Sequence, residues 1–255
     1  MHEMPNEIRA LRDRGALFVV NHSAGKDSQA MLVFLRRHIP AEQLVLIHAD
    51  LGEVEWPGNV AHIERYAGGL PLLVARARRG LLQMVEDRFA ARPEVPSWPS
   101  PKNRQCTSDL KRGPIEREIR RYLRNHPAHN GLVVNCMGMR AQESPGRSKL
   151  NPFKLNQSNS KAGREWYDWL PIHDWTVDQV FDEIRAAGEE PHPVYAKGMT
   201  RLSCCFCIMA SKGDLRTASR LNPGLYQRYV DLERRTGHTM SMSGIPLDQI
   251  ISGTA

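Results

Sequence analysis

The sequence predicts an α/β fold with a parallel sheet, and three observations support this prediction. Short apolar runs rich in β-branched residues alternate with amphipathic runs of helical periodicity over the first half of the chain. The first apolar run is followed at once by a turn of small residues. No internal repeat or coiled-coil heptad interrupts the pattern. Strands that alternate with helices pair in parallel through right-handed crossovers, so ligands are expected beyond the carboxyl ends of the strands.

The elements are expected in the following order. Strands are predicted at the buried apolar runs 17–20, 43–50, 72–75 and 131–137. Helices are predicted at the periodic segments 30–35, 57–66, 81–91, 110–125, 176–187 and 212–235, the last of them broken near Pro223. The proline-rich segment 92–103 is expected to be a surface loop, and the polar segment 141–163 is expected to be irregular and mobile without a ligand. We expect a nucleotide-binding α/β domain at 1–170 and a helical C-terminal region at 171–255, packed on it and carrying a cysteine cluster.

The composition describes a soluble protein and excludes a membrane-spanning one. Of the 255 residues 41% are hydrophobic, and no apolar run approaches the roughly 20 residues that a membrane span needs. The first residues are charged rather than signal-like, so we expect a cytoplasmic protein. The formal net charge of +7 suits anionic partners such as nucleotides or nucleic acid. Arginines on the outer faces of helices, simply solvated, would explain the same charge.

The segment 21–28 has the properties of a phosphate-binding loop. It lies between a predicted strand and a predicted helix, where unpaired N–H groups and the helix dipole favour an anion. A Walker A loop requires a hydroxyl residue after the lysine, and here Asp27 follows Lys26, which excludes the ordinary P-loop. A glycine-containing structural turn remains the alternative. A second segment, 138–147, follows a predicted strand and places Arg140 and Arg147 where they could clamp an oxyanion, or form a surface loop with incidental salt bridges.

Four segments in order resemble a known family. Residues 23–28 resemble the pyrophosphate loop of the adenine nucleotide alpha-hydrolase superfamily, with Ala24 in place of a glycine. The segments 104–114, 138–147 and 171–207 resemble the further signatures of its phosphoadenosine phosphosulfate reductase-like branch. Within that branch the motif pattern is closest to the sulfur-insertion proteins of DNA phosphorothioation. The resemblance implies a Rossmann-like sheet of the HUP type.

The resemblance also implies ATP and Mg²⁺ as ligands, with cleavage between the α and β phosphates. The residues it assigns to catalysis are Lys26, Asp27, Arg140 and Arg147. Those it assigns to the nucleotide are Ser23, Ala24, Gly25, Lys26, Asp27, Ser28, Asp50, Gly138, Glu143 and Ser144. Asp50 and Glu53 end a predicted strand, where they could hold the metal, orient the ribose or cap the next helix.

Four of the five cysteines lie in polar or loop-like contexts, whereas Cys136 belongs to a buried strand. Cys204 and Cys207 form a Cys-x-x-Cys pair, a spacing that can hold zinc or an iron–sulfur cluster. The resemblance adds Cys106 and favours a [4Fe–4S] cluster over zinc. Cys205 would then be a fourth ligand or a nucleophile that carries a persulfide. Buried thiols without a function are the alternative.

Three functions are compatible with these motifs. The first is an ATP pyrophosphatase that adenylates an acceptor such as DNA or tRNA, so that sulfur from a donor such as a cysteine desulfurase displaces AMP. The second is a phosphoadenosine or adenosine phosphosulfate reductase, which the absence of a cysteine after Cys207 disfavours. The third is a nucleotide-binding subunit without catalysis that works beside protein partners in a modification system.

Overall fold

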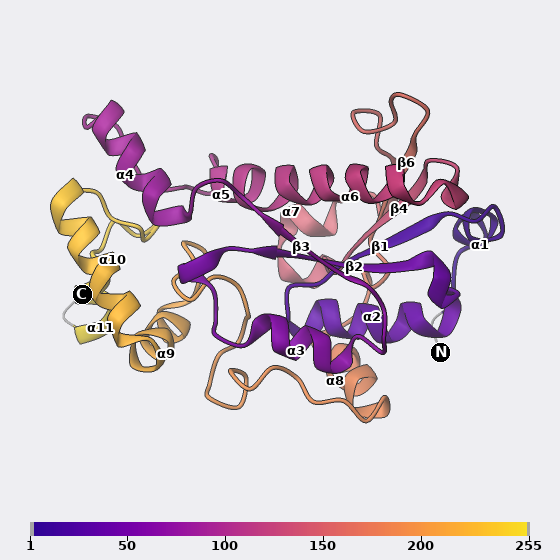
Figure 1. The fold of residues 1–255 in the computed structure, drawn as a ribbon. Coiled ribbons are helices and arrows are strands. Elements are labelled where there is room, and N and C mark those ends of the chain that lie inside the picture. Colours follow the sequence, from indigo (N-terminus) through magenta and orange to yellow (C-terminus); the bar gives the residue numbers. More distant parts are fainter. Residues whose placement is uncertain (1–2, 254–255) are drawn as a thin grey trace. The chain divides into compact units, whose positions relative to one another are not determined.

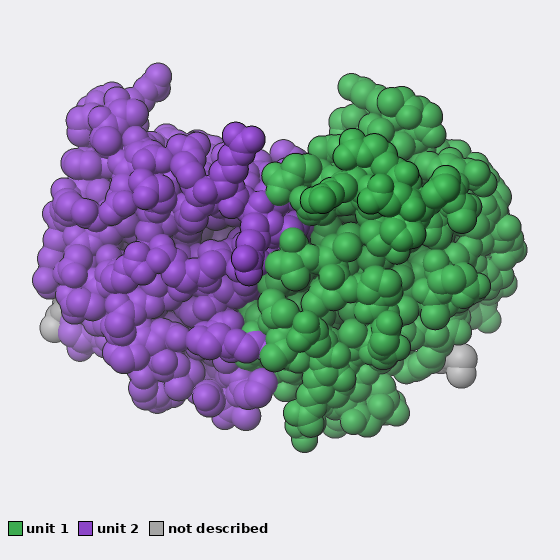
Figure 2. All heavy atoms as spheres, viewed as in Figure 1, with its two compact units in different colours: residues 1–48, 59–74, 116–192 green, residues 49–58, 75–115, 193–255 purple. Residues whose placement is uncertain are grey.

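The structure, a computed structural model, describes residues 3–253 and divides into two compact units that are interleaved along the chain. Unit 1 comprises residues 1–48, 59–74 and 116–192, and unit 2 comprises residues 49–58, 75–115 and 193–255 (Figure 2). The predicted division into domains at residue 170 stays a prediction.

A six-stranded sheet in the order β3-β2-β1-β4-β6-β5 organises unit 1 (Figure 1). The strands are β1 (Leu17–Asn21), β2 (Leu44–Asp50), β3 (Leu72–Arg76), β4 (Leu132–Met137), β5 (Phe153–Leu155) and β6 (Glu165–Trp169). Strand β1 pairs in parallel with β2 and β4, and β4 pairs in parallel with β6. Only the short edge strand β5 is antiparallel among the pairings of β1, β4, β5 and β6. The predicted Rossmann-like α/β fold is therefore confirmed.

The helices of unit 1 cover both faces of this sheet. They are α1 (Asn6–Asp13), α2 (Lys26–His38), α3 (Asn59–Tyr66), α7 (Pro145–Ser148), α8 (Val177–Ala186) and most of α6 (Gly113–Asn125). Helices α2 and α8 lie on one face and α6 on the other (Figure 1). The central residues of α2 are all buried, as expected for a helix packed on several sides. The predicted cap of α8 is confirmed, because the Thr176 hydroxyl accepts a hydrogen bond from the Gln179 amide.

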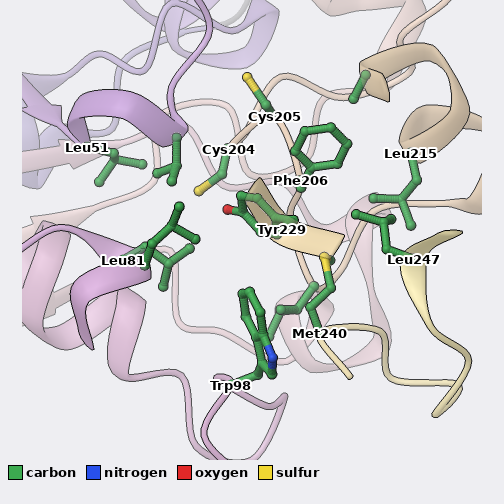
Figure 3. Packing of buried hydrophobic residues seen from close by; sticks show 14 of the residues in the cluster. Leu51, Leu81, Trp98, Cys204, Cys205, Phe206, Leu215, Tyr229, Met240 and Leu247 are labelled. Carbon is green, nitrogen blue, oxygen red and sulfur yellow. The ribbon is translucent and has the colours of Figure 1, made fainter. Parts of the chain in front are cut away.

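Unit 2 is mainly helical and is held together by an apolar core. Its helices are α4 (Leu81–Ala91), α5 (Gln105–Thr107), α9 (Lys212–Leu221), α10 (Pro223–Thr236) and α11 (Leu247–Ser252), with a π-helical turn η3 (Ser108–Arg112) before α6. Tyr229 lies at the centre of the core, with its ring stacked on Trp98 at 5.4 Å and 5.0 Å from that of Phe206 (Figure 3). The predicted break near Pro223 is confirmed, because Asn222 separates α9 from α10.

The segment 141–163 was expected to be irregular, and this is wrong, whereas its mobility without a ligand stays a prediction. This stretch contains a 3-10 turn η5 (Ala141–Glu143), helix α7 and strand β5. Its polar side chains bond to one another and to the sheet, as when the Asn156 amide donates to Asp168 at 2.9 Å. Strand β6, helix α1 and helix α11 were not predicted. No helix within residues 3–253 is both long and apolar enough to span a membrane.

Candidate functional site

The loop between β1 and α2 ends at a helix terminus that no side chain caps. Gly25 is the N-cap of α2, with extended backbone angles (φ −81°, ψ 158°), and as a glycine it supplies no side-chain cap. The first N–H groups of an α-helix have no partner within the helix and carry the positive end of its dipole. A terminus of this kind favours an anion, and the phosphate-binding role of the loop stays a prediction.

Ala24 adopts the left-handed conformation that normally favours glycine. Its φ is 62°, and its side chain is fully buried. The Ala24 amide donates to Nδ1 of His22 at 3.1 Å, which holds the strained residue in place. The Ser28 hydroxyl accepts from the Ser23 amide at 3.1 Å and donates to the Gly25 carbonyl at 2.9 Å. The alanine therefore adopts, inside a hydrogen-bonded loop, a backbone conformation that glycine normally occupies.

His22 is a neutral buried imidazole that sequence reasoning missed. Because its Nδ1 accepts a hydrogen bond, its proton sits on Nε2, which has no partner among the described residues. Burial, reinforced by His62, His48 and Arg36, lowers the pKa of His22 to about 3. The sequence feature that could have revealed it is a titratable residue placed between an apolar strand and the glycine of the loop.

Asp27 joins two cationic side chains of the predicted site. Its carboxylate accepts from Nε of Arg140 at 2.6 Å and lies 3.3 Å from Nζ of Lys26. The side chains of Arg140 and Lys26 are only 3% and 6% exposed. Nη1 of Arg140 also donates to the Trp175 carbonyl at 3.2 Å, which fixes the guanidinium. The structure thus brings together the loop and Arg140, two segments that the sequence placed at one edge of the sheet.

Gly138 allows the end of β4 to approach the loop. A Cβ on Gly138 would lie 3.1 Å from the carbonyl carbon and oxygen of Asp27 and 3.2 Å from the nitrogen of Ser28. These are backbone atoms, so they cannot move aside as a flexible side chain would. The predicted nucleotide contact at this position is thus also a packing requirement of the loop.

Glu143, Ser144 and Arg147 are bonded to one another and to the chain around Arg140. Glu143 accepts from the Arg140 amide at 2.9 Å and forms an ion pair with Arg147. The Ser144 hydroxyl caps α7 by accepting from the Arg147 amide at 3.2 Å. His173 braces the same turn, with Nε2 lying 3.0 Å from the Arg147 carbonyl. In this arrangement these residues hold Arg140 in place, while the roles predicted for them toward a nucleotide stay predictions.

The predicted metal candidates Asp50 and Glu53 belong to unit 2 and are engaged with arginines. Asp50 accepts from the Gly52 amide at 2.7 Å and from Nε of Arg76 at 2.6 Å. Glu53 forms an ion pair with Arg228. Asp50 thus closes the turn before the 3-10 helix η2 (Gly52–Val54), whose N-cap is Leu51, and the metal, ribose and helix-capping roles stay predictions.

The cysteines Cys106, Cys204 and Cys207 come together in unit 2. Burial is the main cause that raises the pKa of Cys106. Lys111 lowers the pKa values of Cys106 and Cys204, whereas a negative charge on Cys207 raises both. Burial is the main cause that raises the pKa of Cys204 to about 11. Cys207 is partly exposed, and its sulfur accepts from the Met209 amide at 3.5 Å.

Cys205 is the most buried thiol of this group. It is 1% exposed, and mainly burial raises its pKa to about 12. Figure 3 draws its sulfur on a different side of the chain from that of Cys204, which faces Tyr229. A thiol that remains protonated and out of reach is a poor nucleophile. The persulfide role considered for Cys205 is therefore disfavoured.

The arrangement of these thiols does not fit the expected [4Fe–4S] cluster. Within residues 3–253 no group of three or more His, Cys, Asp or Glu side chains has an arrangement that could hold a metal ion. The cluster and the zinc alternative are thus without support from the donor geometry.

A family model and two curated relatives match this chain in sequence. A family model described as the phosphoadenosine phosphosulfate reductase domain matches residues 18–210. An uncharacterized 37.8 kDa protein of Escherichia phage 186 is 30% identical over 137 residues, which cover 54% of this chain and 39% of that protein. An uncharacterized protein of Methanocaldococcus jannaschii is 25% identical over 221 residues, which cover 85% of this chain and 47% of the relative.

A solved phosphoadenylyl-sulfate reductase of Candida auris, in complex with phosphate, is 14% identical with a TM-score of 0.45. The match covers 80% of this chain and 97% of the reductase. The chain spans less than half the length of the curated relatives it matches.

Proposed function

Because the chain belongs to the phosphoadenosine phosphosulfate reductase domain family, we propose that it binds ATP and cleaves it between the α and β phosphates. The observation that carries this proposal is the trio of Lys26, Asp27 and Arg140 at the uncapped terminus of α2. Two buried cations and a row of backbone N–H groups then face one anion, which suits the pyrophosphate half of the nucleotide.

The reaction transfers the adenylyl group to an acceptor. An acceptor oxygen attacks the α phosphorus, the bond from this phosphorus to the bridging oxygen breaks, and pyrophosphate leaves. Lys26 and Arg140 stabilise the negative charge that develops on the pyrophosphate, because both cations are fixed before the reaction. Asp27 keeps the two cations aligned.

Mg²⁺ would supply further neutralisation of the phosphate charge when it is bound. It takes most of its ligands from substrate phosphates and water, with one or two protein carboxylates. Asp27 is the carboxylate that fits this description within the loop, because it is one-fifth exposed.

We further propose that the adenylated acceptor receives sulfur. The outer sulfur of a persulfide, supplied by a donor such as a cysteine desulfurase, forms a bond to the activated atom, and AMP leaves with the oxygen it adenylated. A second thiol then attacks the inner sulfur of the persulfide, so that the S–S bond breaks, a disulfide forms on the carrier and the outer sulfur stays on the acceptor. DNA or tRNA is the proposed acceptor, as in phosphorothioation, with protein partners of a modification system. Among the thiols, Cys207 is the proposed sulfur carrier, because it is partly exposed and its sulfur accepts a backbone N–H.

Pyrophosphate release from ATP and Mg²⁺, measured with and without DNA or tRNA, tests the proposal. The wild-type chain is expected to release pyrophosphate, and Lys26→Met is expected to lower the rate by about 100-fold or more. Lys154→Met is the matched control, because Lys154 is exposed on β5 and is expected to have no effect. Equal rates for the two variants would contradict the role of Lys26.

Two other outcomes would replace the proposal with one of the alternatives. Sulfite release from adenosine phosphosulfate in the presence of a thiol would identify a reductase. Tight ATP binding without pyrophosphate release, with every acceptor tested, would identify a nucleotide-binding subunit without catalysis.

A further inference from the structure

Three polar side chains form a row across the sheet of unit 1, next to the phosphate loop. Asn135 on β4 is opposite Asp168 on β6 and opposite Val19 on β1. Because side chains alternate along a strand, Asn21, two residues beyond Val19, lies on the same face. The Asn21 amide donates to Oδ1 of Asn135 at 2.7 Å, and the Asn135 amide donates to Oδ1 of Asp168 at 2.9 Å.

Asp168 fixes the direction of every bond in this row. An ionised carboxylate can only accept hydrogen bonds, and Asp168 accepts them from Asn135, from Asn156 and from the indole of Trp166. The NH₂ group of Asn135 must therefore point to Asp168 and its oxygen to Asn21. The orientation of a side-chain amide is assigned from its hydrogen-bond network, and here Asp168 determines the orientations of both Asn135 and Asn21.

The consequence for Asn21 is that both of its N–H bonds are used inside the protein. One is donated to Asn135, and the other goes to the Cys136 carbonyl at 2.9 Å. Oδ1 of Asn21 has no partner among the described residues, and it is not among their buried unpaired atoms. Asn21 is partly exposed as the last residue of β1. The row thus presents one acceptor oxygen at the end of β1, where the loop begins.

We propose that this oxygen accepts a hydrogen bond from the nucleoside half of the bound nucleotide, and that Asp168 acts through Asn135 as a positioning residue. The inference rests on the proposed ATP binding. Phosphate oxygens at neutral pH are acceptors, so an amide oxygen cannot bond to them directly. The donors that ATP offers are the ribose hydroxyls and the 6-amino group of adenine, and the oxygen recognises one of these.

Equilibrium binding to the full chain, with analogues that each lack one donor, tests the inference. The ligands are ATP, 2′-deoxy-ATP, 3′-deoxy-ATP, purine riboside triphosphate and pyrophosphate. The wild type is expected to bind ATP about threefold to tenfold more tightly than the analogue that lacks the recognised donor. This ratio corresponds to the loss of one neutral hydrogen bond. In Asn21→Leu this ratio is expected to fall to about one, with unchanged affinity for pyrophosphate, because the phosphate contacts are untouched.

A second variant tests the positioning role and keeps the inference testable if Asn21→Leu fails to fold. Asp168→Asn keeps the shape of the side chain but can also donate, so the direction of the row is lost and the ratio is expected to fall. Asn156→Ala is the control, because Asp168 still only accepts, and its ratio is expected to match the wild type. A merely structural role of Asp168 would lower the affinity for all ligands equally and leave the ratio intact.

The outcomes separate the two proposals. A wild type that binds ATP and every analogue with equal affinity would overturn this inference alone. An Asn21→Leu variant that retains the wild-type ratio would also overturn it. A wild type that binds neither ATP nor pyrophosphate would overturn the proposed function, and this inference with it.

Discussion

Asp27 is the residue whose substitution tests the electrostatics of the loop most directly. Asp27→Asn keeps the shape of the side chain and removes the negative charge between two buried cations, Arg140 and Lys26. Removing one partner of a buried ion pair costs about 3–5 kcal/mol, because the other charge is left uncompensated. Asp27 is itself 20% exposed, so water partly screens the pair, and we expect a loss of about 3 kcal/mol in the free energy of unfolding.

Urea unfolding followed by circular dichroism measures this loss. The matched control is Asp178→Asn, since Asp178 occupies the same second position of its helix, α8, but is exposed. That variant loses only an interaction with the helix dipole, which is worth about 0.3–1 kcal/mol. Adding Arg140→Met to Asp27→Asn is expected to recover part of the stability, because the uncompensated charge is removed together with its partner.

The same variant is expected to respond more strongly to pyrophosphate. In the wild type a phosphate must compete with Asp27 for the two cations, whereas in Asp27→Asn it supplies the missing negative charge. Pyrophosphate is therefore expected to raise the melting temperature of Asp27→Asn more than that of the wild type. Equal free energies of unfolding for Asp27→Asn and Asp178→Asn would refute the reasoning, as would strictly additive effects in the double variant.

Three further predictions concern other parts of the chain. Gly138→Ala is expected to lower the free energy of unfolding by about 1–3 kcal/mol, because the added Cβ displaces the loop. Gly146→Ala is the control, since its Cβ would meet only one side-chain atom, at 4.0 Å, and urea unfolding of this variant is expected to match the wild type. Since the pKa of His22 is lower in the folded than in the unfolded chain, its contribution to stability is present above about pH 6.5 and is lost toward about pH 3. The free energy of unfolding is expected to fall by about 2 kcal/mol between about pH 7.5 and pH 5 because of this histidine. His22→Asn keeps a hydrogen-bond acceptor but does not titrate, so unfolding measured across this pH range should not show the loss. Iodoacetamide is expected to label Cys207 in the native protein and leave Cys205 unmodified by mass spectrometry, and the reverse order would contradict the burial of Cys205.

The parts of the fold that could be predicted from the sequence are those that local patterns determine. The strand, turn and helix around the loop were predicted because a short continuous apolar run is followed by small residues and then by an apolar periodicity of 3.6. Strand β6 was missed because its polar residues, Asp168 among them, bond to partners on β4 and just after β5, which a local pattern does not contain. Its alternation of aromatic and acidic residues was the signal that could have revealed it.

The candidate site was predictable in its residue types but not in their bonds. Arg140 was expected beside the loop from its place after a strand, yet its contact with Asp27 depends on the tertiary structure. The neutral state of His22 depends on burial beside three other basic side chains, which no local pattern contains. The same limit applies to the cysteines, since spacing indicates which thiols can meet but not whether their sulfurs are arranged to hold a metal.

Most of the side chains assigned to the nucleotide are bonded to the protein itself, and this determines how an anion would bind. The Ser28 hydroxyl closes the loop, and Glu143 and Ser144 hold the turn that carries Arg140. What remains for a phosphate is the uncapped terminus of α2 and the two cations that share Asp27. Binding is then an exchange, in which phosphate oxygens replace one carboxylate as the counter-charge. The net gain from charge is smaller than two cations alone would give, so the backbone N–H groups, whose positions depend on the strained Ala24, carry a large share of the affinity.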